Sequence, residues 1–124
     1  MKERAKDYLN KGIAKLKSAN EELFRPEEDV VTYSVCKNSQ FAIENYLKGY
    51  LLNNNVEVEE YKTIAQLLAQ CVLINENFKK LDFSDIDCKV KALDSRYCSS
   101  IEKVNSCFDA ADSLDTLLRQ EQII

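Results

Sequence analysis

Apolar residues recur at helical spacing from the beginning of the chain to its end. In the first segment they fall at steps of three, four and seven on one stripe, opposite a row of lysines: Ala5, Tyr8, Leu9, Ile13, Leu16 and Leu23. This spacing predicts a helix that ends at about Phe24. Pro26 suits the first turn of a second helix, because its missing N–H would have no partner there in any case.

Between Val30 and Leu52 the apolar positions cover more than one stripe. They are Val31, Val35, Ala42, Ile43, Tyr46, Leu47, Tyr50 and Leu51. Such a wide apolar surface is typical of a central helix with several neighbours, and it also suits contact with a second subunit. Asn53, Asn54 and Asn55 are predicted to end this helix, since asparagine tolerates the left-handed conformation common after a helix C-terminus.

The second half of the chain contains two further long apolar patterns and one short one. The acidic stretch Glu57–Glu60 is expected to open a third helix, which carries Tyr61, Ile64, Leu67, Leu68, Cys71, Ile74, Phe78 and Leu81 on one face. Ser84 is a candidate cap for a short helix from Ile86 to Ser95, and Ser99 or Ser100 for the last helix. The last helix is expected to bury Ile101, Val104, Phe108, Ala111, Leu114, Leu117 and Leu118, and to point Glu102, Asp109, Asp112 and Asp115 outward.

These elements predict an all-α fold, an antiparallel up-and-down four-helix bundle with an extra short helix. A length of 124 residues fits one domain, residues 1–124, with enough surface to bury a single core. Only two glycines and one proline occur, which favours a few long elements over many short ones.

Cysteine usage and the N-terminus favour a reduced, soluble, cytoplasmic protein. The five cysteines are an odd set without a C-x-x-C pair, and the first ten residues contain no apolar stretch that could serve as a secretory signal. Buried apolar thiols are the simplest expectation for them, and neither a metal site nor a cofactor is implied. No run approaches the roughly 20 apolar residues of a membrane span.

Charge is distributed unevenly around a net value of −4. Residues 1–25 hold seven Lys and Arg against four Asp and Glu, whereas residues 26–124 hold ten against seventeen. This balance argues against broad attraction to nucleic acid, which needs a concentrated basic face. The basic residues of the first helix are expected to form a solvated face: Lys2, Arg4, Lys6, Lys11, Lys15 and Lys17.

Several classes of enzyme are disfavoured by what the chain lacks. Histidine is absent, and with it Ser–His triads, Cys–His dyads and most zinc hydrolase sites. No glycine-rich phosphate loop of the known patterns occurs, and two glycines are too few to build one.

A polar row on the second helix is the remaining candidate site. Gln40, Glu44 and Lys48 are spaced four apart, so they are predicted to line one face, and Glu44 precedes Lys48 in the favoured orientation for an ion pair. The alternative is an ordinary surface ion pair worth about 0.3–0.5 kcal/mol.

The second helix and the segment before the last helix resemble the HEPN domain family. Residues 36–48, read as CKNSQFAIENYLK, are similar to the family signature small-Q-x-A-x-E-K-x-L-K. Arg96-Tyr97-Cys98 is similar to the R-Y-P turn that precedes its last helix. The order of elements agrees over nearly the whole chain. Asn45 stands where lysine is usual, and Cys98 where proline is.

The resemblance implies a helical bundle that commonly dimerises, with the polar row and Arg96 near a shared cleft. Active ribonucleases of the family have an arginine followed four to six residues later by histidine, whereas no histidine follows Arg96. A histidine often found early in the third helix is also missing, with Tyr61-Lys62-Thr63-Ile64 in its place. Arginine can hold a phosphate through its fork of donors, but it is a poor acid or base. A purely structural role for Arg96, paired with Glu44 or a helix C-terminus, is the alternative.

Three functions remain open from the sequence. The favoured one is a non-catalytic HEPN-like binding or assembly module, a homodimer whose cleft around Arg96, Gln40, Glu44 and Lys48 engages a nucleotide, RNA or a minimal nucleotidyltransferase partner. The alternative is a divergent ribonuclease toxin of a toxin–antitoxin pair, in which Tyr97, Ser99 or Glu102 replaces the histidine beside Arg96. The third is an interaction bundle unrelated to this family.

Overall fold

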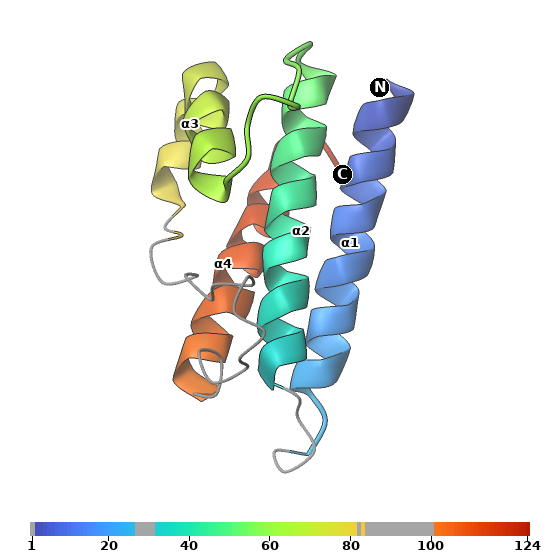
Figure 1. Ribbon diagram of the computed structural model, residues 1–124, viewed down its shortest axis with the longest axis vertical. Helices are drawn as coiled ribbons and strands as arrows, with labels where there is room; N and C mark the ends of the chain where they lie inside the picture. Colours follow the sequence, from blue (N-terminus) through green and yellow to red (C-terminus); the bar gives the residue numbers. More distant parts are fainter. Residues whose placement is uncertain (1, 27–31, 82, 84–100) are drawn as a thin grey trace.

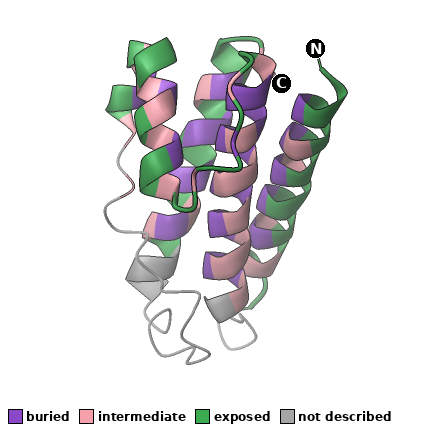
Figure 2. Cartoon of the chain, turned by 45° about the horizontal axis from the view of Figure 1, so that its top comes forward, coloured by how far each residue is buried: buried purple, intermediate pink, exposed green. Residues whose placement is uncertain are grey.

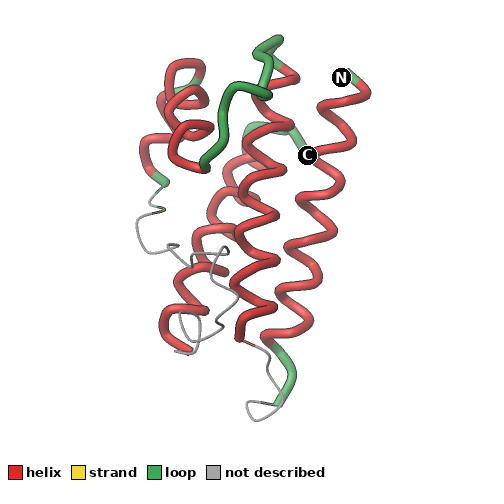
Figure 3. The backbone as a smooth tube through the Cα atoms, viewed as in Figure 1, coloured by secondary structure: helices red, strands yellow, loops and turns green. Residues whose placement is uncertain are grey.

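All regular secondary structure in the described part of the protein is helical. The computed structural model describes residues 2–26, 32–81, 83 and 101–124, and within them it contains four α-helices and one 3-10 helix, with no strand. The prediction of an all-helical bundle is thereby confirmed (Figure 3). In chain order the elements are α1 Glu3–Leu23, α2 Thr32–Asn53, α3 Ile64–Ile74, η2 Glu76–Lys80 and α4 Ile101–Gln120.

Helix α2 lies at the centre of the bundle (Figure 1). Helix α1 runs antiparallel to it along one side, α4 packs against it in the same direction as α2, and α3 packs near its C-terminal end. The purple positions in Figure 2 show how much of α2 is buried compared with its neighbours. Its fully enclosed apolar residues include Val35, Ala42, Ile43, Tyr46, Leu47 and Leu51. The prediction of a central helix with several apolar faces is therefore confirmed for these residues.

The apolar stripe of α1 packs against α2 as the spacing predicted. Ala5, Leu9 and Leu16 are buried, and Tyr8, Ile13 and Leu23 are partly buried against the same core. Two glycines leave room for large side chains at this helix contact. A Cβ on Gly12 would lie 2.6 Å from Cδ1 of Tyr46, and a Cβ on Gly49 would lie 2.6 Å from Cγ of Leu9. Each helix therefore has a notch that a large side chain of the other fills.

The predicted ends of the first two helices agree with the structure. Helix α1 ends at Leu23, and α2 ends at Asn53. Asn55 adopts the left-handed conformation with φ of 67°. The predicted start of the second helix near Pro26 falls at residues 27–31, outside the described residues; the helix as described begins at Thr32.

The third helix differs from the prediction at both ends. Residues 57–60, expected to open it, lie in a loop and a turn, and α3 begins at Ile64 after a capping box. In this box the Thr63 hydroxyl accepts from the N–H of Gln66, and the Gln66 side chain accepts from the N–H of Thr63. The helix then ends at Ile74, and Phe78 is carried on η2.

The remaining predicted elements are described only in part. The short helix 86–95 and the candidate caps Ser84, Ser99 and Ser100 lie outside the described residues. Helix α4 forms as predicted, with Ala111, Leu114 and Leu118 buried. In the described part of the chain, no helix is both long enough and apolar enough to cross a membrane.

Candidate functional site

The predicted ion pair of α2 forms on the outer side of that helix. Lys48 Nζ lies 2.8 Å from Glu44 Oε1. The two side chains remain partly accessible, at 22% for Lys48 and 37% for Glu44. Taken alone, such an i,i+4 pair is worth only about 0.3–0.5 kcal/mol.

Gln40, the third member of the predicted row, is directed toward the interior. Its residue is only 8% exposed, and its Nε2 donates to the Sγ of Cys36 at 3.6 Å. That sulfur also lies 3.1 Å from the Sγ of Cys107 on α4. Gln40, at one end of the row, is therefore buried near the contact between α2 and α4, whereas Glu44 and Lys48 are partly accessible at the surface. Arg96 lies outside the described residues, so its approach to this row stays a prediction.

Lysines and aromatic rings alternate across the outer side of the α1–α2 contact. Lys11 and Lys48 each place Nζ near the Tyr8 ring, at 5.4 and 5.8 Å from its centroid. Lys15 and Lys37 do the same at the ring of Phe41, at 5.7 and 5.6 Å. We call this surface the lysine–aromatic seam; it comprises Tyr8, Lys11, Lys15, Lys37, Phe41 and Lys48, with Glu44 at its edge.

The seam concentrates positive charge on a chain that is acidic overall. Among the described residues that form it, four ammonium groups accompany the carboxylate of Glu44, which pairs with Lys48. Contacts of this kind are worth about 0.5–1 kcal/mol at exposed sites, and they hold the lysine stems over the rings. The basic residues of α1 were predicted only as a solvated face. What the sequence did not reveal is that Lys11 and Lys15 meet Lys37 and Lys48 across two helices.

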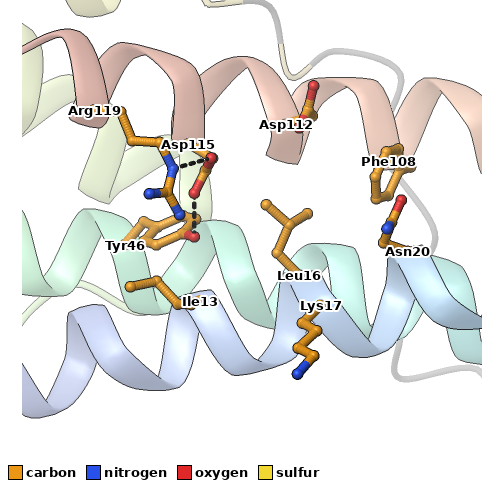
Figure 4. A pocket seen from close by; sticks show the side chains of 9 residues that line it. All are labelled: Ile13, Leu16, Lys17, Asn20, Tyr46, Phe108, Asp112, Asp115 and Arg119. Atoms are coloured by element: carbon orange, nitrogen blue, oxygen red, sulfur yellow. Dashed lines mark hydrogen bonds and ion pairs between the residues drawn. The ribbon is translucent and has the colours of Figure 1, made fainter. Parts of the chain in front are cut away.

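A concave site lies on another side of α1, between α1 and α4. We call it the α1–α4 groove. It has a volume of about 360 Å³, and Figure 4 shows its lining: Ile13, Leu16, Lys17, Asn20, Tyr46, Phe108, Asp112, Asp115 and Arg119.

A buried carboxylate organises one end of this groove. Tyr46 donates its hydroxyl to Asp115 Oδ1 at 2.6 Å, and Arg119 donates Nε–H to Asp115 Oδ2 at 2.8 Å. Burial and the bond to Asp115 raise the pKa of Tyr46 well above its usual value. The same carboxylate raises the pKa of Arg119, through its hydrogen bond and its charge. A tyrosine on α2 and an arginine on α4 are thus joined through one anion.

The outward orientation predicted for Asp115 is wrong. The residue is only 8% exposed, whereas Asp109 and Asp112 are exposed as predicted. Two donors satisfy Asp115, and one of them lies 69 positions away in the chain. Its i,i+4 spacing from Arg119 was the only local signal of this network.

The described residues contain no group of three or more Cys, Asp or Glu side chains arranged to hold a metal ion. Cys71 and Cys107 are buried thiols, and burial raises the pKa of Cys71 to about 12. A buried thiol with a raised pKa is a poor nucleophile near neutral pH.

Comparison with known proteins identifies the family. No curated protein and no solved structure matches the chain. The family model described as HEPN domain matches residues 5–114, which cover most of α1, all of α2 and α3, and most of α4. The chain therefore belongs to the HEPN domain family.

Proposed function

We propose that this HEPN domain is a non-catalytic binding module for a nucleotide or RNA. The observation that carries the proposal is the absence of histidine from a chain of this family. Without imidazole, the chain lacks the side chain best suited to transfer protons near neutral pH. Arginine and lysine hold phosphate oxygens without transferring protons, so binding is retained where cleavage is not.

The positive charge of the lysine–aromatic seam supports this proposal. Lys48 belongs both to the predicted ligand-binding row and to the seam. Its Nζ lies 2.8 Å from Oε1 of Glu44. Phosphates neutralised by lysines release counterions, which favours association at low salt. We propose that Lys48 and Arg96 contact the phosphates, with Glu44 positioning Lys48 and Gln40 supporting the inner end of the row.

We further propose that the domain acts as a homodimer and that a minimal nucleotidyltransferase is its partner protein. Domains of this family commonly dimerise. The proposed ligand-binding row lies on α2, the helix that is central to the bundle. Light scattering of the purified chain tests the dimer, and a mass equal to one chain across the concentration range would contradict it.

Binding is tested by titrating a labelled single-stranded RNA and a labelled nucleotide with the purified protein at low salt. We expect Arg96→Ala and Lys48→Gln each to weaken binding by at least tenfold, since a charged contact is worth about 1.5–3 kcal/mol. Lys79→Gln is the matched control, because Lys79 is exposed on η2 and is expected to leave binding unchanged. A wild-type protein that binds neither ligand would refute the proposal.

The same samples decide between binding and cleavage. We expect RNA to remain intact during incubation with the wild-type protein and with Arg96→Ala. Cleavage by the wild type that disappears in Arg96→Ala would replace the binding module with a ribonuclease. Equal cleavage by both proteins would indicate contamination and leave the binding titration as the deciding measurement.

A further inference from the structure

The α1–α4 groove shares no residue with the lysine–aromatic seam. Helix α1 presents Tyr8, Lys11 and Lys15 to the seam, and it presents Ile13 and Leu16 to the groove. We propose that the groove binds a small organic carboxylate with an apolar body, which the terminal guanidinium nitrogens of Arg119 hold by its charged end.

The guanidinium of Arg119 is held in a fixed orientation by a buried partner. Asp115 accepts from Nε at 2.8 Å and is itself fixed by the Tyr46 hydroxyl at 2.6 Å. Within the described residues the two terminal nitrogens of Arg119 have no hydrogen-bond partner. Figure 4 shows them in the space between α4 and α1, above Ile13. A guanidinium that is bonded through Nε still offers a pair of parallel N–H donors, which match the two oxygens of a carboxylate.

Beyond Arg119 the groove has an apolar part between polar side chains. Leu16 projects into it from α1, and Phe108 faces it from α4 (Figure 4). At the far end, the Asn20 amide lies beside Phe108 and has no side-chain hydrogen bond among the described residues. A ligand that satisfies these groups has a carboxylate at one end, a hydrocarbon body over Leu16, and room for one polar atom at the other end. The volume of about 360 Å³ is within the range of small-molecule sites.

The charges around the groove favour a monoanion over a phosphate. Lys17 and Arg119 contribute two positive charges, and Asp112 and Asp115 contribute two negative charges. Lys17 and Asp112 point away from each other at the rim, so neither is directed at the centre (Figure 4). A dianion would place twice the excess negative charge of a carboxylate beside these acids. The orientation of Arg119 therefore suits one negative charge with two oxygens in a plane.

The test uses 3-phenylpropionate and its uncharged amide, which have the same shape and differ in charge. Each is titrated into the isotopically labelled chain, and backbone amide resonances are followed by NMR. We expect the carboxylate to shift resonances at Ile13, Leu16, Phe108 and Arg119 with saturation, and the amide to bind about tenfold more weakly, because a charged hydrogen bond is replaced by a neutral one.

Arg119→Gln is the variant and Arg25→Gln its matched control. The two arginines are similarly exposed, at 54% and 56%, and each pairs with a carboxylate three or four residues earlier in the chain, but Arg25 lies just beyond the end of α1 and outside the groove. We expect Arg119→Gln to remove the preference for the carboxylate and Arg25→Gln to keep it. RNA binding is expected to be unchanged in Arg119→Gln, so a failure of the groove proposal and a failure of the proposed function are distinguishable.

Three results would overturn the groove proposal. They are equal affinity of the wild type for the acid and the amide, shifts confined to the seam residues Tyr8 and Lys48, and no saturable shift at all. The comparison of acid with amide needs only the wild-type protein, so it decides the matter even where Arg119→Gln does not fold.

Discussion

Asp115 illustrates how a charged side chain becomes part of a helical core. A buried carboxylate is tolerated only when donors replace its water, and here Tyr46 and Arg119 supply one donor for each oxygen. Position 115 looks like an exposed acid from the sequence, because the helical pattern of α4 contains no information about what α2 places opposite. Burial of an acid depends on a distant donor, which periodicity alone does not reveal.

Removing the tyrosine donor tests this arrangement. We expect Tyr46→Phe to lower the free energy of unfolding by about 1–3 kcal/mol, because the buried carboxylate of Asp115 would lose one of its two donors. Urea denaturation measures the change. Tyr61→Phe is the control, since Tyr61 is only partly buried and its hydroxyl donates no hydrogen bond within the described residues. Equal losses in the two variants would contradict the role given to the Tyr46 hydroxyl.

The buried thiol of Cys71 makes the free energy of unfolding vary with pH in the alkaline range. Burial raises its pKa from 9.0 to about 12, so between these values the folded chain keeps a proton that the unfolded chain has released. This contribution is complete below pH 9.0 and is lost as the pH rises toward 12. It amounts to about 1.4 kcal/mol per pH unit.

We therefore expect the unfolding free energy of Cys71→Ala to fall less steeply with pH than that of the wild type over this interval. Urea titrations at a series of pH values give the two slopes. Val72→Ala removes a partly buried neighbour without a titratable group and should keep the wild-type slope. Parallel slopes for Cys71→Ala and the wild type would show that the thiol does not titrate as described.

At the scale of elements, the apolar spacing was a good guide to α1, α2 and the described part of α4. These helices are long, and their apolar stripes pack on a continuous core. The spacing was a poor guide to α3, where residues 57–60 continue a helical pattern without forming a helix. The capping box at Thr63 places the start, because its side chain satisfies an N–H of the first turn that has no partner within the helix.

Loss of this cap should destabilise α3 locally. We expect Thr63→Ala to lower the free energy of unfolding by about 1 kcal/mol and to speed amide hydrogen exchange at Gln66. Thr63→Ser keeps the accepting hydroxyl and should retain most of the stability. Thr116→Ala on the exposed surface of α4 controls for the loss of a threonine as such. Unchanged exchange at Gln66 would argue against the cap.

The notches at Gly12 and Gly49 reverse the usual effect of replacing glycine in a helix. Alanine normally stabilises a helix over glycine by about 1 kcal/mol. Here the added Cβ would overlap Tyr46 or Leu9 at 2.6 Å, so we expect Gly12→Ala and Gly49→Ala each to destabilise by about 1–3 kcal/mol. Thermal unfolding tests this, with Ser18→Ala on the exposed side of α1 as the stabilising control. A rise in the melting temperature of either glycine variant would mean that the contact between α1 and α2 can accommodate the added methyl group.

At the scale of the whole molecule, the lysine–aromatic seam opposes the net charge of −4. Overall charge predicted weak attraction to nucleic acid, and it gave no sign of the seam, because the four lysines come from two segments of the sequence. The sequence predicted the family and the Glu44–Lys48 pair, because both depend on local spacing. Contacts between distant segments, such as the seam, needed the folded structure.

Salt dependence separates binding at the seam from non-electrostatic binding. If four lysines contact phosphates, the logarithm of the RNA association constant should fall with the logarithm of salt concentration with a slope of about −3. Replacing Lys11 and Lys15 with glutamine should reduce the steepness by about 1.4, since each phosphate contact on a single strand contributes about 0.7. Replacing Lys79 and Lys80, which are exposed on η2, should leave the slope unchanged. A slope near zero for the wild type would place the bound RNA elsewhere.

The paired notches of α1 and α2 have a consequence for how ligands are positioned. Tyr46 fills the space at Gly12, while Leu9 fills the space at Gly49, so sliding one helix along the other by a turn would empty both at once. The position of α1 along α2 is therefore fixed by two contacts: a side chain of α2 packs at Gly12 of α1, and a side chain of α1 packs at Gly49 of α2. Lys11 on α1 and Lys48 on α2 are thereby kept at a constant spacing, and the phosphates of an extended anion would have to match that spacing in order to contact both lysines.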